Sequence, residues 1–357
     1  MAAPTATTSI ARPRVDLYSD TVSRPTDGMR RAIAEAEVGN EQAGEDPTVN
    51  RLQAMVAELL GKEMALFLPS GTMCNEIAYR VWCDHGDEII LDATSHALHF
   101  ETGGPGALAG VMTRPVSGDR GIFTGAQVEA VIRPKTRHAP RQKLVSIENT
   151  ANLGGGAIWP LEQVADVAAV ARAHGMRVHM DGARLLNAVV ASGISAARFA
   201  AEVDSAWIDL SKGLGCPIGG VLAGSAAFIE EAWRFKHQFG GAMRQAGIVA
   251  AAGVYALEHH VDRLADDHTR AKRLADGIAD LRDIAVDANR VDTNMVYFDV
   301  SGTGVDGPEF SRRLMAEHQV RIGAMSASSL RAVTHLDVDD RDIETAIAAI
   351  RAVTAEA

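Results

Sequence analysis

Short apolar runs alternate with helix-forming segments along the first two-thirds of this 357-residue chain. Strands are predicted at 64–68, 88–91, 110–115, 143–147, 177–180, 206–210 and 220–223. Helices are predicted at 46–60, 71–83, 125–132, 161–174 and 185–191. Because strands that alternate with helices form parallel sheets covered on both faces, the pattern predicts an α/β fold with a mostly parallel sheet.

The pattern changes after Gln245. A long helical tract is predicted to about Leu281, with a break near 260–261. A strand, a helix, a strand and a last helix follow, at 295–300, 308–318, 330–336 and 340–353. We therefore predict a mobile tail over 1–14, a large domain over 15–250 and a smaller α+β domain over 251–357. No long linker separates the two domains, so we expect them to pack closely.

Composition limits the possible partners of the chain. Its formal net charge of −11 argues against nucleic acid and anionic membranes. No apolar run approaches a membrane span or a secretory signal, which favours a cytoplasmic location. The three cysteines, Cys74, Cys83 and Cys216, lack metal-ligand spacing and are expected to be buried thiols, and no metal site is predicted.

Lys212 is the first candidate for chemistry. The segment WIDLSKGL at 207–214 places this lysine at the end of an apolar strand, just before a glycine-rich turn. Poor solvation would disfavour its ammonium form and make the amine nucleophilic. Taken alone, the segment is better explained by a lysine whose side chain simply reaches solvent, because most lysines lie at the surface.

Two further segments change that balance. Asp181 follows the strand at 177–180, and open α/β sheets bind ligands beyond the carboxyl ends of their strands. The turn Ser70-Gly71-Thr72 opens a helix, where free amides can hold a phosphate. Each feature has an ordinary explanation as helix capping. A phosphate turn, a carboxylate and a lysine in this order are together typical of a site for pyridoxal 5'-phosphate (PLP).

Eight motifs in the chain are similar to those of the threonine aldolase family, PLP enzymes with the fold of aspartate aminotransferase (fold type I). The resemblance extends from Asp16 to the C-terminus. The motifs are DLYSDTVSRPT (16–26), GEDPTVNRL (44–52), LPSGTMCN (68–75), IENT (147–150), HMDGARLLNA (179–188), SKGLGCPIGG (211–220), MRQAG (243–247) and LRAVTHLD (330–337).

The resemblance implies a set of cofactor contacts. Lys212 would form a Schiff base with PLP, Asp181 would face the pyridine nitrogen, and Arg184 would face the ring hydroxyl. The phosphate would be held by Ser70, Gly71 and Thr72. Arg244 would lie near the phosphate, and one way to place it there is from a neighbouring subunit.

The resemblance also implies substrate contacts. His96 would stack on the pyridine ring, although a histidine at a helix start can also make a purely local hydrogen bond. Arg331 would bind the substrate carboxylate, as a guanidinium fork suits both oxygens, and its apolar neighbours argue against an ordinary surface arginine. Ser19 would lie near the same carboxylate.

Three positions depart from the family pattern. A histidine expected after IENT is Ala151, a tyrosine before GEDPT is Ala43, and a lysine before the MRQAG motif is His237. Without the first histidine, His96 or a water that it orders becomes the candidate base for the β-hydroxyl. The loss of polar groups around the substrate side chain favours bulkier substrates such as phenylserine.

We therefore expect an aldolase that cleaves L-threonine, L-allo-threonine or a related β-hydroxy-α-amino acid to glycine and an aldehyde. A β-eliminating lyase and an amino-acid racemase are the alternatives on the same scaffold. A transaminase, a dehydrogenase and a non-enzymatic scaffold fit the motifs less well. The family resemblance implies a homo-oligomer, with a tetramer expected.

Overall fold

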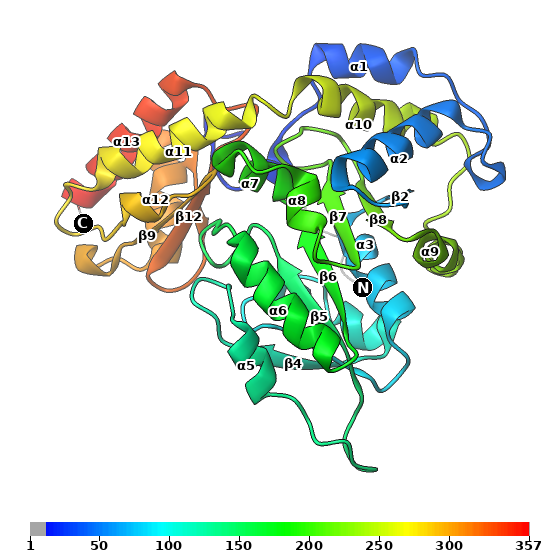
Figure 1. The fold of residues 1–357 in the computed structure, drawn as a ribbon. Coiled ribbons are helices and arrows are strands. Elements are labelled where there is room, and N and C mark those ends of the chain that lie inside the picture. The colour runs from blue at the N-terminus through cyan, green and yellow to red at the C-terminus, as the bar shows by residue number, and fades with distance from the viewer. Residues whose placement is uncertain (1–11, 357) are drawn as a thin grey trace, which may run out of the picture.

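A computed structural model describes residues 12–356, with a central sheet of seven strands (Figure 1). The predicted tail at 1–14 lies largely outside the described residues. The strands of the sheet are Met64–Leu68 (β2), Glu88–Asp92 (β3), Met112–Val116 (β4), Gln142–Glu148 (β5), Arg177–Gly182 (β6), Ser205–Asp209 (β7) and Gly220–Gly224 (β8). All seven predicted strands are confirmed within two residues at either end.

The strands lie in the order β2-β8-β7-β6-β5-β3-β4. Neighbours from β7 to β4 pair in parallel, and β8 is antiparallel to both β2 and β7. A short turn at 210–219 joins β7 to β8, and a connection of this length permits antiparallel pairing where a helical crossover would give a parallel neighbour. The predicted mostly parallel sheet is confirmed.

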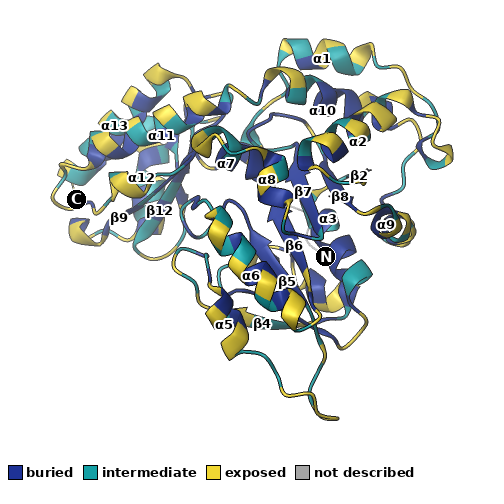
Figure 2. Ribbon diagram, viewed as in Figure 1, coloured by how far each residue is buried: buried dark blue, intermediate teal, exposed yellow. Residues whose placement is uncertain are grey.

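Helices cover this sheet, and their inner faces are buried (Figure 2). The predicted helices are present as Pro47–Leu60 (α2), Gly71–Trp82 (α3), Gly125–Ala130 (α5), Leu161–Ala173 (α6) and Leu185–Ser192 (α7). Four helices were not predicted: Asp27–Ala34 (α1), His96–His99 (α4), Ala196–Ala200 (α8) and Ala226–Gln238 (α9). The three cysteines are buried and unpaired, as expected.

A second hydrophobic core lies in the C-terminal unit, on the left of Figure 1. The predicted tract after Gln245 is two helices, Gly247–His259 (α10) and Leu264–Ile278 (α11), with the expected break between them. The remaining elements are Met295–Asp299 (β9), Gly307–His318 (α12), Val320–Arg321 (β10), Gly323–Ala324 (β11), Ser329–Val333 (β12) and Asp340–Ala355 (α13).

The amino-terminal segment connects the two units. Val15–Asp16 (β1) pairs in parallel with β10, and Leu17 lies in the second core. Six residues later the chain reaches the turn after β7, where Ser23 Oγ donates a hydrogen bond of 2.9 Å to the carbonyl of Lys212. Within residues 12–356, the helices are all too short or too polar to span a bilayer.

Candidate active site

Lys212 lies in the turn after β7, at the carboxyl end of the central strands. Its side chain is 13% exposed, and its Nζ is 2.9 Å from Asp209 Oδ2. Nζ also lies 5.8 Å from the centroid of the Trp207 ring. The turn that carries Lys212 is held from both sides, because Gly215 N donates to the carbonyl of Lys212 as well. The predicted reactive lysine is therefore mostly enclosed and has a carboxylate partner.

Asp181 is at the end of β6 and is fixed by two hydrogen bonds. Its Oδ2 accepts from Asn75 Nδ2 at 2.8 Å, and its Oδ1 accepts from Ala183 N at 3.0 Å. Asn75 is itself oriented, because its Oδ1 accepts from Trp207 Nε1 at 2.7 Å. The side chain of Asp181 thus has one defined orientation. Asn75 was not singled out from the sequence, although it ends the LPSGTMCN motif.

The turn at 70–72 forms the N-terminus of α3, as predicted. Ser70 is the N-cap, and its side chain accepts from Met73 N at 3.2 Å. The amides of Gly71 and Thr72, in the first turn, have no partner within the helix and are free for an anion. A Cβ on Gly71 would lie 2.2 Å from the Trp207 ring, so the turn can approach this ring so closely only with glycine.

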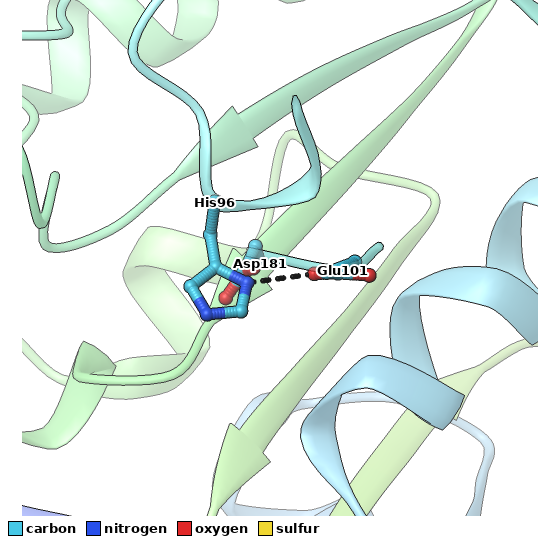
Figure 3. A group of neighbouring side chains, drawn as sticks. All are labelled: His96, Glu101 and Asp181. Carbon is cyan, nitrogen blue, oxygen red and sulfur yellow. Dashed lines mark hydrogen bonds and ion pairs between the residues drawn. The ribbon is translucent and has the colours of Figure 1, made fainter. Parts of the chain in front are cut away.

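His96 begins α4 and faces the same cavity. Its Nδ1 is 2.8 Å from Glu101 Oε1, and His96, Glu101 and Asp181 offer atoms that all lie within 4.8 Å of one another (Figure 3). Burial disfavours the charged imidazole, but the hydrogen bond to Glu101 and the carboxylate of Asp181 outweigh it, so the pKa of His96 lies above its usual value. With Nδ1 directed to Glu101, Nε2 is the nitrogen left for a ligand.

Glu148, at the end of β5, holds part of the cavity wall in place and was not singled out from the sequence. Its two oxygens accept from His96 N at 2.7 Å and from Asn152 N at 2.8 Å. Burial and the charge of Asp181 raise the pKa of Glu148 to about 7, although the two backbone amides act in the opposite direction. Glu148 therefore fixes the backbone of two residues that line the cavity.

Arg184 lines the cavity, but its guanidinium forms a buried ion pair. Nε donates to Asp20 Oδ2 and Nη2 donates to Asp20 Oδ1, each at 2.7 Å. Asn294 Nδ2 adds a third hydrogen bond to this carboxylate at 3.1 Å. Burial opposes ionisation of Asp20, but the pair with Arg184 outweighs it and holds the pKa of Asp20 well below its usual range. Asp20 lies in the first motif of the family resemblance, yet the sequence did not indicate its partner.

Asp20→Asn is expected to lower the free energy of unfolding by about 3–5 kcal/mol, because it leaves the Arg184 charge buried without compensation. The lowered pKa of Asp20 stabilises the folded protein at pH values above about 4, the pKa of an aspartate in the unfolded chain. The stability of the wild type should therefore fall as the pH drops below that value, and the variant should lack this pH-dependent loss. Urea unfolding at several pH values measures both effects.

A control for this variant is Asp337→Asn, which breaks the pair of Asp337 with Arg24. That pair has an N–O distance of 3.0 Å, but the arginine is 70% exposed, so a loss under about 1 kcal/mol is expected. Equal losses of unfolding free energy in the two variants would show that the buried pair stabilises the fold no more than the exposed pair does.

Arg331 comes from β12 in the smaller unit and reaches the outer part of the site. Its Nη1 donates to Asn152 Oδ1 at 2.7 Å and its Nη2 to the carbonyl of Tyr18 at 3.4 Å. Its Nε is buried and has no hydrogen-bond partner among the described residues. Ser19 is also buried nearby, where its Oγ accepts from Thr21 Oγ1 at 2.9 Å. A guanidinium group that borders the outer cavity fits an incoming carboxylate.

The side chains described above enclose two adjoining spaces. An inner cavity of about 180 Å³ is bordered by the α3 turn, Asp181 and Lys212. An outer cavity of about 580 Å³ is bordered by Ser19, Phe100 and Arg331 among others. The two share the lining residues His96, Asn152, Arg184 and Lys212.

Two sequence expectations fall outside these cavities. Arg244 is exposed and lines neither of them. Ala151, in the position where a histidine was expected, is buried and packs close to Gly121. All the other site residues named from the sequence border one or both spaces.

The inner cavity fits the cofactor that the motifs imply. Free amides of a helix N-terminus suit a phosphate, a fixed carboxylate suits a protonated ring nitrogen, and an enclosed amine suits an aldehyde. Gly71 packs so closely on the Trp207 ring that a Cβ would collide with it, and both residues border this cavity. A planar, phosphorylated aldehyde therefore has a matching group at each end of this space.

Comparison with known proteins gives the family of the chain. A family model of beta-eliminating lyases matches residues 16–301. The low specificity L-threonine aldolase of Escherichia coli (strain K12) is 40% identical over 343 residues, which cover 96% of this chain and 99% of the relative. The low-specificity L-threonine aldolase 1 of Arabidopsis thaliana is 39% identical over 92% of this chain and 93% of its own length. A solved structure of Leishmania major threonine aldolase has a TM-score of 0.80 at 19% identity, covering 95% of this chain and 99% of that chain.

Proposed function

The chain belongs to the beta-eliminating lyase family, and from this premise we propose that it is a PLP-dependent aldolase that cleaves β-hydroxy-α-amino acids to glycine and an aldehyde. L-threonine and L-allo-threonine are the reference substrates. The observation that carries the proposal is the inner cavity, where Lys212, Asp181 and the α3 turn meet. The outer cavity with Arg331 supplies the place for an amino acid.

Bound PLP supplies an electron sink that accepts the pair released when a bond to the substrate α-carbon breaks. Asp181 would hold a proton on the ring nitrogen, and its fixed orientation through Asn75 means that this charge is in place before reaction. Lys212 would hold the cofactor at rest and accept or return a proton at Nζ once the substrate amine replaces it. Asp209 Oδ2, 2.9 Å from Nζ, holds the Lys212 side chain in position.

The substrate would be oriented by its carboxylate and deprotonated at its β-hydroxyl. Arg331 would bind the carboxylate through its guanidinium group, while Asn152 holds that group in position. His96 Nε2 would take the β-hydroxyl proton, directly or through one water, and Glu101 at Nδ1 stabilises the resulting imidazolium. The buried Ala151 offers no group for this step, which supports the assignment to His96.

The outer cavity supports a broad choice of β-substituent. It has about 580 Å³ of space and is bordered by the aromatic side chains of Tyr18 and Phe100, which are 43% and 46% exposed. Such rings favour apolar contact with an aryl or alkyl substituent. We therefore expect phenylserine to be accepted beside the two threonine diastereomers.

The test is a product assay on PLP-loaded protein with a panel of β-hydroxy amino acids. Release of glycine and an aldehyde in equal amounts is expected. A 2-oxo acid that keeps all the carbons of the substrate, released with ammonia, would instead indicate β-elimination, and inversion of the α-carbon would indicate racemisation. Either of these as the main outcome would overturn the proposal.

Arg331→Gln is expected to raise KM far more than it lowers kcat. Loss of hydrogen bonds to a charged carboxylate costs about 1.5–3 kcal/mol, or about 10–150-fold in kcat/KM. Arg331→Lys keeps the charge but not the planar fork, so it should lie between wild type and Gln. Steady-state kinetics on L-threonine measures the split, and a fall in kcat with unchanged KM would contradict this role.

We also propose that the protein is a homo-oligomer, with a tetramer expected. The exposed position of Arg244 supports this proposal, because an arginine predicted near the phosphate would then act on the site of a neighbouring copy. Light scattering on the purified protein gives the mass. A monomer with full activity would exclude this function for Arg244.

A further inference from the structure

Glu76 is a fully buried carboxylic acid that the reaction described above does not use. It lies on α3 next to Asn75. Neither of its side-chain oxygens accepts a hydrogen bond from an N–H or hydroxyl group in the described part of the chain. A Cβ on Gly104 would lie 2.3 Å from its Oε1, so the carboxyl group is tightly enclosed. A buried polar group without a donor normally has a specific reason to be there.

The neighbour of Glu76 is the carboxylate that holds His96. Glu101 Oε1 accepts from His96 Nδ1 and from Asn75 Nδ2, each at 2.8 Å. Glu101 Oε2 is buried and has no such donor, and Glu76 is within hydrogen-bond reach of Glu101. Two buried carboxyl groups in contact cannot both be ionised, so one proton must lie between them.

The partners decide where that proton is held. Glu101 has two N–H donors that stabilise its charged form, whereas Glu76 has none. Burial, followed by the charge of Glu101, raises the pKa of Glu76 to about 9. Glu76 is therefore the neutral acid at physiological pH, and Glu101 is the anion.

We propose that Glu76 is a positioning residue whose O–H donates to Glu101 and thereby limits how strongly Glu101 draws the Nδ1 proton of His96. The chain Glu76–Glu101–His96 then ends at Nε2, the atom proposed above to take the β-hydroxyl proton. The role in catalysis rests on the proposed function, while the arrangement of the proton does not.

The direction of the effect follows from the charges. A hydrogen bond donated to Glu101 spreads its negative charge, so the imidazolium form of His96 gains less from it and His96 stays a usable base near neutral pH. Without that donor, Glu101 would favour the imidazolium more strongly. The other titratable or charged groups that face this cluster are Cys74 and Tyr79 on α3, Glu148 on β5, Asp181 on β6 and Lys212 after β7.

Two variants of matched size separate hydrogen bonding from packing. Glu76→Leu removes the donor, and the acid limb of the kcat profile of the PLP-loaded enzyme should move to higher pH by about one unit, the size expected for one hydrogen bond to a charged group. Glu76→Gln still donates through its amide, so its acid limb should stay near that of wild type. An unshifted Leu profile, or equal shifts in both variants, would overturn the proposal.

Two measurements do not depend on turnover. Infrared difference spectra of the full chain, wild type minus Glu76→Gln, should show the C=O band of a protonated carboxylic acid at neutral pH, and a missing band would overturn the proposal. The NMR titration of His96 should move upward in Glu76→Leu to match the kinetic shift. If glycine is not the product but both signals are found, the proton arrangement stands and the aldolase assignment fails. If Glu76→Leu does not fold, the infrared comparison still decides.

Discussion

Lys212→Ala is expected to leave no measurable release of glycine from any β-hydroxy amino acid. The variant removes the amine that holds the cofactor and that returns the proton at the end of each cycle, and no other lysine borders either cavity. The small alanine side chain also leaves Asp209 without its partner at 2.9 Å. Phosphate and ring contacts remain, so PLP should still bind, but without a covalent attachment.

Three readouts follow this variant. The absorbance of covalently attached cofactor should be lost, borohydride should no longer fix PLP to the peptide that contains position 212, and turnover should vanish. Lys135→Ala is a suitable control, because Lys135 is exposed in the loop after α5 and borders neither cavity. A variant at position 212 with full activity would end the PLP scheme.

His96→Asn is expected to lower kcat by about 10²–10⁴-fold, the usual range for loss of a general base. The asparagine amide can still donate to Glu101 in place of Nδ1, so the local hydrogen bond is preserved. It offers no base where Nε2 was. KM and the affinity for PLP should therefore change much less than kcat, although some loss of ring stacking on the cofactor is expected.

Single-turnover kinetics and PLP titration measure these two effects separately. His174→Asn serves as the control, since His174 pairs with Glu129 at the end of α6, outside both cavities. Equal, small losses in kcat and in PLP affinity for His96→Asn would point to a different base. Glu148, with its pKa near 7, is the next group to examine in that case.

The sheet could be predicted because its signal is local. Most strands from β2 to β8 are short apolar runs between turn residues, and the N-cap Asp46 followed by Pro47 marks the start of α2. Helices α1 and α9 were not predicted, since several charged residues stand between their apolar positions and conceal their buried faces. The break between α10 and α11 was found at the expected residues.

The site could be predicted only in its chemistry-bearing residues. Lys212, Asp181 and the turn at 70–72 follow strands, and parallel strands bring their carboxyl ends to one edge. Their supporting partners are distant in sequence: Asn75 is 106 residues from Asp181, and Asp20 is 164 residues from Arg184. No local pattern specifies such pairs, because they depend on how the elements pack. Glu76 is the hardest of these residues to predict. A glutamate in a helical segment is ordinarily expected at the surface, whereas this one is buried.

The segment from β1 to Asp20 has a practical consequence for anyone who trims or tags this protein. A few residues near the amino end complete a strand pair in one unit and neutralise an arginine in the other. Deleting them would remove a counter-ion from the wall of the active site and an apolar side chain from the far core in a single cut. Affinity tags should therefore be joined ahead of Arg12, and truncations that extend past Val15 should yield insoluble or inactive material.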